Sequence, residues 1–167
     1  VAMVLNGSPL FSGGAGSGES EIRKWILEQD LLEAIISLPT NMFYNTGIST
    51  YIWILSNHKS SERIGKIQLI DASDFYQRMR KKLGEKGKEL GESDIKQITK
   101  LYFDFEESKQ SKIFEARDFG YTNITIENPL KDEAGNIVIS TKGKSKGRPQ
   151  PDANKRDTEN IPLNEDI

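Results

Sequence analysis

The sequence predicts an α/β fold, because apolar segments typical of strands alternate with one amphipathic helix in the first 73 residues. The segments 31–37 and 49–55 are nearly continuous apolar runs, as in a sheet covered on both faces. Shorter strands are expected at 1–5 and 66–70, and the helix at 19–29. The order strand, helix, strand indicates part of a doubly wound sheet.

Turn residues and the spacing of apolar residues predict the individual elements of this region. After strand 1–5, Asn6-Gly7-Ser8-Pro9 is turn chemistry and the Gly-rich segment 12–18 predicts a mobile loop. Helix 19–29 carries Ile22, Trp25 and Ile26 at helical spacing. A right-handed crossover through this helix makes the first two strands parallel. About ten residues join the second and third strands, too few for a crossover helix, so this pair is expected to be antiparallel.

The region 74–107 is predicted to be helical, first basic and then amphipathic. The basic part is the densest positive cluster of the chain, with Arg78, Arg80, Lys81, Lys82, Lys86 and Lys88. Ile95, Ile98, Leu101, Tyr102 and Phe105 form the helical apolar stripe of the second part. Residues 121–127 and 137–139 predict a small hairpin around the turn 132–135. From Thr141 the chain is almost free of apolar residues, which predicts a flexible tail.

Composition excludes several kinds of site. The chain has no cysteine, so disulfides and thiolate metal sites are excluded, and His58 is its only histidine. The net charge is -2, so any contact with nucleic acid needs a local basic patch or another subunit. No apolar stretch predicts a membrane span and no basic leader is visible, which favours a cytoplasmic protein. Since the opening Val1-Ala2-Met3 already has the pattern of a buried strand, we expect a fragment of a longer protein.

One loop has the clearest functional pattern. Between two apolar strands the chain reads Leu38-Pro39-Thr40-Asn41-Met42-Phe43-Tyr44-Asn45-Thr46-Gly47-Ile48. An aromatic side chain on such a rigid connection suits stacking on a flat ring. Together with segments 4–11 and 22–27, this loop resembles the late half of the catalytic domain of amino-methylating DNA methyltransferases. Within that group the chain resembles the modification subunit of type I restriction-modification systems, and segments 118–130 and 156–163 resemble its carboxy-terminal extension.

The resemblance implies a fold and a division of the chain. The fold would be the C-terminal part of a Rossmann-like methyltransferase sheet with a helical and small β extension. Residues 1–73 would be the C-terminal half of the catalytic domain, 74–140 the extension, and 141–167 the flexible tail.

The resemblance also implies roles for the loop. Phe43, with Tyr44 as its neighbouring candidate, would stack on the target adenine after the base flips out of the duplex. Asn45, Thr46 and Gly47 would shape the loop beside the extruded nucleotide. We expect Gly47 to supply a backbone conformation closed to larger residues.

The implied activity is methyl transfer from S-adenosylmethionine to adenine N6 in double-stranded DNA by the full-length protein. The implied partners are double-stranded DNA and the specificity and restriction subunits of a type I complex. The family's Gly-rich cofactor turn and Asn/Asp-Pro-Pro-aromatic tetrad are not in this sequence. The nearest match, Asn128-Pro129-Leu130, is interpreted as a turn. We therefore predict no catalytic, cofactor-binding or metal-binding residue in this chain, and no activity of the fragment by itself.

Alternatives stay open for each site. Phe43 is also compatible with a core aromatic that closes a hairpin. Contacts with the DNA backbone are predicted for Arg23, Lys24, Arg78, Arg80, Lys81 and Lys82, although a basic run is often just a solvated face. The rival function is a non-catalytic DNA-binding or subunit-interaction module. A third hypothesis is a hydrolase that uses Asp71 and His58. The simpler expectation is that His58 lies in a surface loop and that Asp71 caps the turn after its strand.

Overall fold

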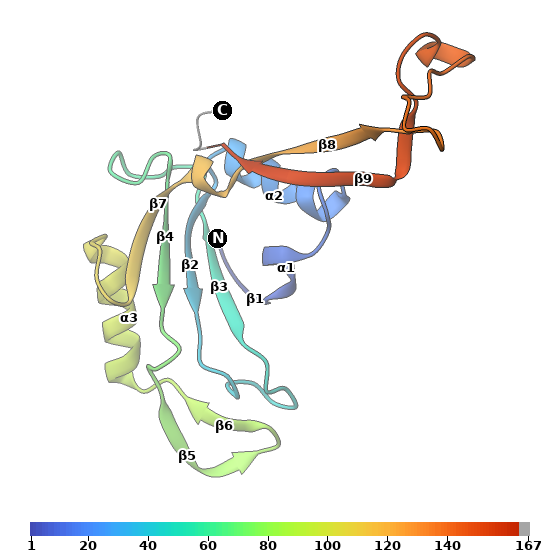
Figure 1. Ribbon diagram of the computed structural model, residues 1–167. Helices are drawn as coiled ribbons and strands as arrows, with labels where there is room; N and C mark the ends of the chain where they lie inside the picture. The colour runs from blue at the N-terminus through green and yellow to red at the C-terminus, as the bar shows by residue number, and fades with distance from the viewer. Residues whose placement is uncertain (164–167) are drawn as a thin grey trace. The chain divides into compact units, whose positions relative to one another are not determined.

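The computed structural model describes residues 1–163 and divides into two compact units, Val1–Phe119 and Gly120–Ile167. The first unit holds a five-stranded sheet in the order β1-β3-β2-β4-β7 (Figure 1). The strands are β1 (Ala2–Asn6), β2 (Leu32–Ser37), β3 (Thr50–Leu55), β4 (Lys66–Asp71) and β7 (Ser111–Glu115). The helices are α1 (Ser8–Phe11), α2 (Gly18–Glu28), α3 (Glu92–Asp104) and the short 3-10 helix η1 (Ala116–Phe119). The predicted α/β class is confirmed.

The sheet is mixed. β2 and β4 are parallel, whereas β3 runs antiparallel to both of its neighbours, β1 and β2. The predicted antiparallel pair β2–β3 is therefore confirmed. β1 and β2 point the same way, as expected from the crossover, but β3 lies between them. β7 adds an antiparallel edge strand beside β4 that the sequence pattern did not assign to this sheet.

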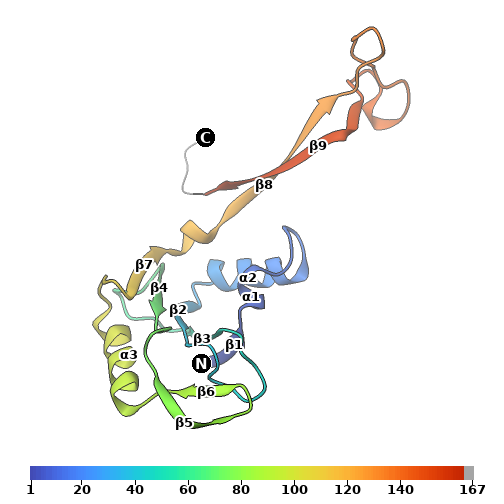
Figure 2. The same ribbon diagram turned by 60° about the horizontal axis from the view of Figure 1, so that its bottom comes forward.

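A helix covers each face of the sheet, and two apolar cores result (Figure 2). On one face, Ile98 of α3 packs with Ile36 of β2 and Ile70 of β4. On the other face, Ile26 and Leu27 of α2 pack against a core that includes Trp53 of β3. Because successive strand residues point to opposite faces, the continuous apolar runs of β2 and β3 serve both cores.

The helices between β1 and β2 differ in detail from the prediction. Ser8–Phe11 forms one helical turn with proline in its first turn, where the missing N–H costs nothing. In α2 the predicted stripe is shifted: Ile26 and Leu27 point inward, whereas Ile22 is 61% exposed and Trp25 is 56% exposed. The spacing of apolar residues correctly predicted the helix, but it did not predict which face of the helix is buried.

The basic segment after β4 is not helical, which corrects the prediction for residues 77–89. It forms the antiparallel hairpin of β5 (Gln77–Leu83) and β6 (Lys86–Glu89). Gly84 turns the chain at φ +62°, a conformation that glycine adopts at little cost. Gly84 and Gly87 would also weaken a helix by about 1 kcal/mol each relative to alanine. The predicted amphipathic helix follows as α3 and buries Ile98.

The first unit extends beyond the division expected after residue 73, because α3 and β7 complete its sheet and cores. The second unit is built on the antiparallel pair of β8 (Tyr121–Pro129) and β9 (Pro151–Pro162). β8 confirms the strand predicted at 121–127. The strand predicted at 137–139 is reduced to single bridges at Ile137 and Ile139.

β9 corrects the flexible tail predicted from Thr141, for residues 151–162. Its side chains are mostly polar and exposed, and backbone hydrogen bonds to β8 hold it, so an apolar pattern could not reveal it. The short 3-10 helix η2 (Gly143–Ser145) lies between β8 and β9. The end of the predicted tail, residues 164–167, lies outside the described residues. No helix in the described part of the chain is long and apolar enough to cross a membrane.

Candidate functional site

The loop between β2 and β3 begins on a rigid base. The backbone N–H of Leu38 donates to the carbonyl of Thr50 at 2.9 Å, which closes the loop across the two strands. Leu38 is buried in the α3-side core, and Pro39 is fully buried. The loop is therefore an ordered extension of the sheet.

The far end of the loop is a tight turn that presents two aromatic rings. A bridge joins Phe43 to Thr46, and Asn45 between them adopts a left-handed φ of +60°. Phe43 is 39% exposed and Tyr44 is 64% exposed. Phe43 thus belongs to neither buried core, which removes the core-aromatic alternative.

Asn41 fastens this loop to the β5–β6 hairpin. Its carbonyl accepts the N–H groups of Gly87 at 3.0 Å and Lys88 at 3.2 Å. Its side-chain Nδ2 donates to the carbonyl of Glu85 at 3.2 Å. Asn41 has φ +59°, a left-handed conformation that asparagine tolerates better than most residues. Sequence reasoning missed this role, although asparagine in a loop between strands is a recognised signal for such a conformation.

Gly47 corrects one prediction. Its φ is not in the left-handed region, so it does not supply the unusual backbone conformation expected of it. A Cβ at this position would instead lie 3.2 Å from Nδ2 of Asn41. Glycine at 47 therefore leaves room for the side chain that fastens the loop.

The turn also packs against the hairpin. A Cβ placed on Gly84 would lie 3.0 Å from Oδ1 of Asn45 and 3.6 Å from the ring of Tyr44. Residues 41–47 and 77–89 consequently form one continuous surface, which we call the loop–hairpin surface. The structure brings together the predicted stacking residues and the predicted basic cluster, which are about 40 residues apart in sequence.

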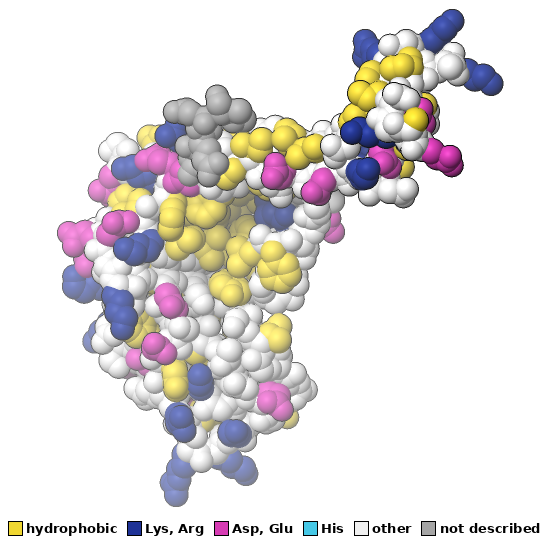
Figure 3. Space-filling model, viewed as in Figure 1, with side chains coloured by type: hydrophobic (Ala, Val, Ile, Leu, Met, Phe, Trp, Pro, Cys, Tyr) yellow, Lys and Arg dark blue, Asp and Glu magenta, His cyan; other side chains and the backbone are white. Residues whose placement is uncertain are grey.

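The cations of the loop–hairpin surface are available to an anionic partner. Figure 3 shows Lys and Arg side chains gathered over the β5–β6 hairpin. Arg78, Arg80, Lys81 and Lys82 are exposed, and among residues 1–163 none of the four forms an ion pair. Lys88 is held differently, because its Nζ lies 3.9 Å from the centroid of the Tyr76 ring. The four exposed cations are therefore within reach of a phosphate.

Arg23 and Lys24 lie on α2, along the sheet and away from the hairpin (Figure 1). The Arg23 guanidinium donates to the carbonyls of Pro9, Ser12 and Gly13, the second at 2.6 Å. These bonds tie down the Gly-rich loop that was expected to be mobile. Lys24 pairs with Glu28 at 3.9 Å on the exposed side of the helix. The structure does not bring these two residues into the loop–hairpin surface.

Asp71 and His58 do not form a hydrolase site. β3 leads to His58, and its end pairs with the start of β2, whereas Asp71 ends β4 beside the end of β2. The two residues therefore lie at opposite ends of the sheet. Hydrogen bonds from the hydroxyl and the backbone N–H of Ser73 lower the pKa of Asp71, as expected for a turn cap. His58 is exposed in a surface loop, as predicted.

A buried polar cluster that the sequence analysis missed holds α3 to the sheet. Arg63 is 4% exposed, and its Nε lies 3.4 Å from the carboxylate of Glu33. Its guanidinium also donates to Gln68 and to the carbonyl of Tyr102, near the end of α3. Burial, followed by a hydrogen bond to Glu33, raises the pKa of the Tyr102 hydroxyl. The cluster is structural and lies inside the first unit.

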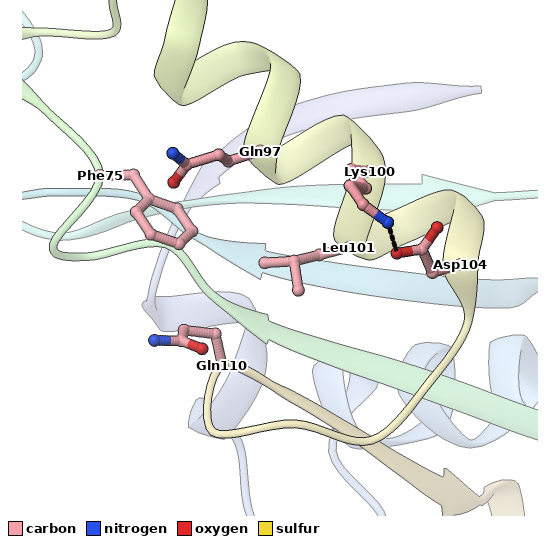
Figure 4. Close-up of a pocket in the computed structure, with 6 residues that line it drawn as sticks. All are labelled: Phe75, Gln97, Lys100, Leu101, Asp104 and Gln110. Atoms are coloured by element: carbon pink, nitrogen blue, oxygen red, sulfur yellow. Dashed lines mark hydrogen bonds and ion pairs between the residues drawn. The ribbon is translucent and has the colours of Figure 1, made fainter.

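Neither of two surface pockets contains a predicted site residue. The first, of about 310 Å³, lies beside α3 and is lined by Phe75, Gln97, Leu101 and Gln110, with the Lys100–Asp104 pair at its side (Figure 4). The second, of about 230 Å³, is an apolar groove between α3 and strands β2 and β3. Ile36, Ile52 and Ile98 are among its walls. A binding function for the loop therefore rests on an exposed surface.

The described residues offer no clear cofactor or metal site. The Gly-rich loop has a composition found in phosphate cradles, but it lacks the Lys-Ser/Thr that completes a P-loop. The Arg23 guanidinium binds the carbonyls of Ser12 and Gly13 in it. A Cβ on Gly13 would lie 2.1 Å from Oγ of Ser17, so the loop is closed on itself. Within residues 1–163 no cluster of three or more His, Cys, Asp or Glu side chains is placed to hold a metal ion.

Comparison with known proteins identifies relatives of the chain. The N-6 DNA Methylase family matches residues 1–133. The chain is 39% identical over 107 residues to the methylase subunit of the type I restriction enzyme MjaVII from Methanocaldococcus jannaschii, a match covering 64% of this chain and 18% of that protein. It is 43% identical over 73 residues to the HindI methylase subunit of Haemophilus influenzae, covering 43% of this chain and 15% of that protein.

A solved structure of a protein with a related name has a similar fold. The methyltransferase subunit of a type I restriction-modification system from Streptococcus thermophilus matches with a TM-score of 0.59 and 28% identity. The match covers 70% of this chain and 23% of that chain. The present chain spans about a fifth of the length of these curated relatives.

Proposed function

Because the chain belongs to the N-6 DNA methylase family, we propose that it supplies the base-facing and duplex-facing surface of a type I modification subunit. The complete subunit would methylate adenine N6 in double-stranded DNA. The observation that carries the proposal is the loop–hairpin surface. On it Phe43 and Tyr44 are exposed, and Tyr44 lies against the turn of the hairpin at Gly84. The same hairpin carries four exposed cations that form no ion pair among residues 1–163.

The two halves of this surface suit two tasks. Stacking of a base on an aromatic ring contributes roughly 1–3 kcal/mol, which offsets part of the few kcal/mol that base flipping costs. Phe43 would receive the flipped adenine, and Tyr44 would be its neighbour. Asn45, Thr46 and Gly47 would keep the turn in shape through their contacts with the loop and hairpin. Arg78, Arg80, Lys81 and Lys82 would bind the phosphate backbone without reading sequence.

The methyl donor would be held by another part of the complete subunit. S-adenosylmethionine, when bound there, supplies an electrophilic methyl group, and the present residues contribute binding and orientation of the base. A specificity subunit and a restriction subunit are the proposed partners. The proposal is supported by relatives that are named as methylase subunits of type I restriction enzymes. Arg23 and Lys24 are weaker candidates for DNA contact because internal bonds already engage both.

The test of the proposed function is Phe43→Ala in the complete subunit. We expect the affinity for a duplex with an extruded adenine to fall by about 5- to 150-fold, the equivalent of roughly 1–3 kcal/mol of lost stacking. Fluorescence of 2-aminopurine at the target position should change accordingly, whereas cofactor affinity should not change.

The matched control is Ile48→Ala. Ile48 is 53% exposed and apolar, and it lies on the same loop but has no aromatic ring. If both variants and the parent give equal 2-aminopurine fluorescence, Phe43 does not receive the base. A loss of the same size in both variants would indicate general loop packing instead of stacking.

A further inference from the structure

The connection between β8 and β9 ends in a second concentration of positive charge. Residues 140–148, here called the tip loop, read Ser-Thr-Lys-Gly-Lys-Ser-Lys-Gly-Arg. Every second residue from 142 to 148 is a cation, and the residues between them are glycine or serine. Figure 3 shows these Lys and Arg side chains at the far end of the β8–β9 pair. The chain as a whole is net negative, so this is a strong local reversal of charge.

Within residues 1–163, the cations of the tip loop form no ion pair with an acidic side chain. No Asp or Glu occurs between Glu133 and Asp152 in sequence. Ion pairs do form along the strands themselves, where Arg156 meets Glu127 and Lys155 meets Asp152. By contrast, within the described chain Lys142, Lys144, Lys146 and Arg148 take part in none, and all four are exposed.

The tip loop nevertheless has a defined backbone. The N–H of Ser140 donates to the carbonyl of Arg148, and the N–H of Gly147 donates back to Ser140. Gly143 and Gly147 adopt left-handed φ values of +72° and +84°. Below this turn, Val138 and Gln150 bond to each other and to Leu130. The cations therefore stand on a closed, hydrogen-bonded turn.

We propose that the tip loop binds the phosphate backbone of duplex DNA, as a site separate from the loop–hairpin surface. Phosphate contact needs exposed cations and little else, and small intervening residues let a backbone approach closely. A protein partner would be expected to bury aromatic or aliphatic side chains at the centre of its interface. The tip loop has no apolar side chain at all, so its chemistry favours a polyanion over a protein surface.

The inference rests on the proposed function only in naming DNA as the polyanion. The test is the triple substitution Lys142→Gln, Lys144→Gln and Lys146→Gln in the complete subunit. DNA affinity is measured by fluorescence anisotropy over a range of salt concentrations. Each lost phosphate contact lowers the slope of log K against log salt by about 0.9, so we expect a slope less steep by about two to three.

The matched control is Lys96→Gln, Lys109→Gln and Lys112→Gln. It removes the same charge from exposed positions of the first unit that form no ion pair in the described part of the chain. Its slope should equal that of the parent, and circular dichroism should show that both variants fold. An unchanged slope in the tip variant overturns the proposal. If the slope is unchanged and binding to a specificity subunit is lost, the tip loop is a protein contact and the proposal is wrong.

Failure of this inference is distinguishable from failure of the proposed function. The tip variant should leave 2-aminopurine fluorescence at saturating protein unchanged, because the tip loop contributes no stacking ring. Phe43→Ala should change that fluorescence but leave the salt slope unchanged, because phenylalanine neutralises no phosphate.

Discussion

At the scale of single residues, Asn41 links the two halves of the loop–hairpin surface. Its backbone carbonyl accepts two N–H groups of β6, and its side chain reaches the turn of the hairpin. Asn41 makes both kinds of bond from a left-handed backbone, with φ +59°. The aromatic turn and the basic hairpin are therefore held in a fixed relation by one small polar residue. Its side-chain and backbone contributions can be separated by mutation.

We predict that Asn41→Gly and Asn41→Ala weaken the surface to different degrees. Both lose the side-chain bond to Glu85, worth about 0.5–1.5 kcal/mol. Alanine also pays about 1–2 kcal/mol for the left-handed conformation, whereas glycine does not. Hydrogen exchange of a peptide spanning residues 84–89 should therefore be slowest in the parent, faster in Asn41→Gly and fastest in Asn41→Ala. Parent-like exchange in Asn41→Ala would show that Asn41 does not fasten the loop.

At the scale of elements, the predictions succeeded where apolar residues dominate. The runs of β2 and β3 and the stripe of α3 were found because each buries several side chains in a core. β5, β6 and β9 were missed because their stability comes mainly from backbone pairing, which leaves no apolar pattern. Gly84 in the basic run was the available signal for a turn.

In the candidate site, too, some features could be predicted from the sequence and others depend on tertiary contacts. The aromatic loop was recognisable from its sequence, but its docking on a hairpin about 40 residues later depends on tertiary contacts. Arg63 was missed for a related reason. A lone arginine in a polar loop gives no sign that it will be buried between Glu33 and the end of α3.

The turn of the β5–β6 hairpin gives a prediction at this scale. Gly84→Ala places a Cβ at φ +62° and 3.0 Å from Oδ1 of Asn45, so we expect a loss of more than about 1 kcal/mol of stability. Displacement of Tyr44 and Asn45 should lower DNA affinity several-fold in the complete subunit. Gly87→Ala is the control, because its Cβ meets only the flexible side chain of Lys82 and its φ is ordinary. Equal DNA affinity in the two variants would show that the hairpin turn does not support the aromatic turn.

At the scale of the whole molecule, positive charge is concentrated in two places although the net charge is negative. The chain carries a net charge of -2, yet cations that form no ion pair among the described residues gather at the loop–hairpin surface and at the tip loop. The net charge of this chain does not attract DNA, so we propose that any DNA affinity of the chain comes mainly from these two places. Each lies at the end of a two-stranded hairpin, one in each compact unit. If both contact the same duplex, their contributions to counterion release should add.

We therefore predict additive salt slopes for the two surfaces. In the complete subunit, Arg80→Gln, Lys81→Gln and Lys82→Gln should make the slope of log K against log salt less steep by about two to three. The tip variant should make the slope less steep by a similar amount. The combined variant should lose the sum of both, because each neutralised phosphate contributes its own share of counterion release. An unchanged slope in the hairpin variant would remove the basic cluster from the interface. A combined loss no larger than one single loss would mean that the two surfaces do not bind one duplex at the same time.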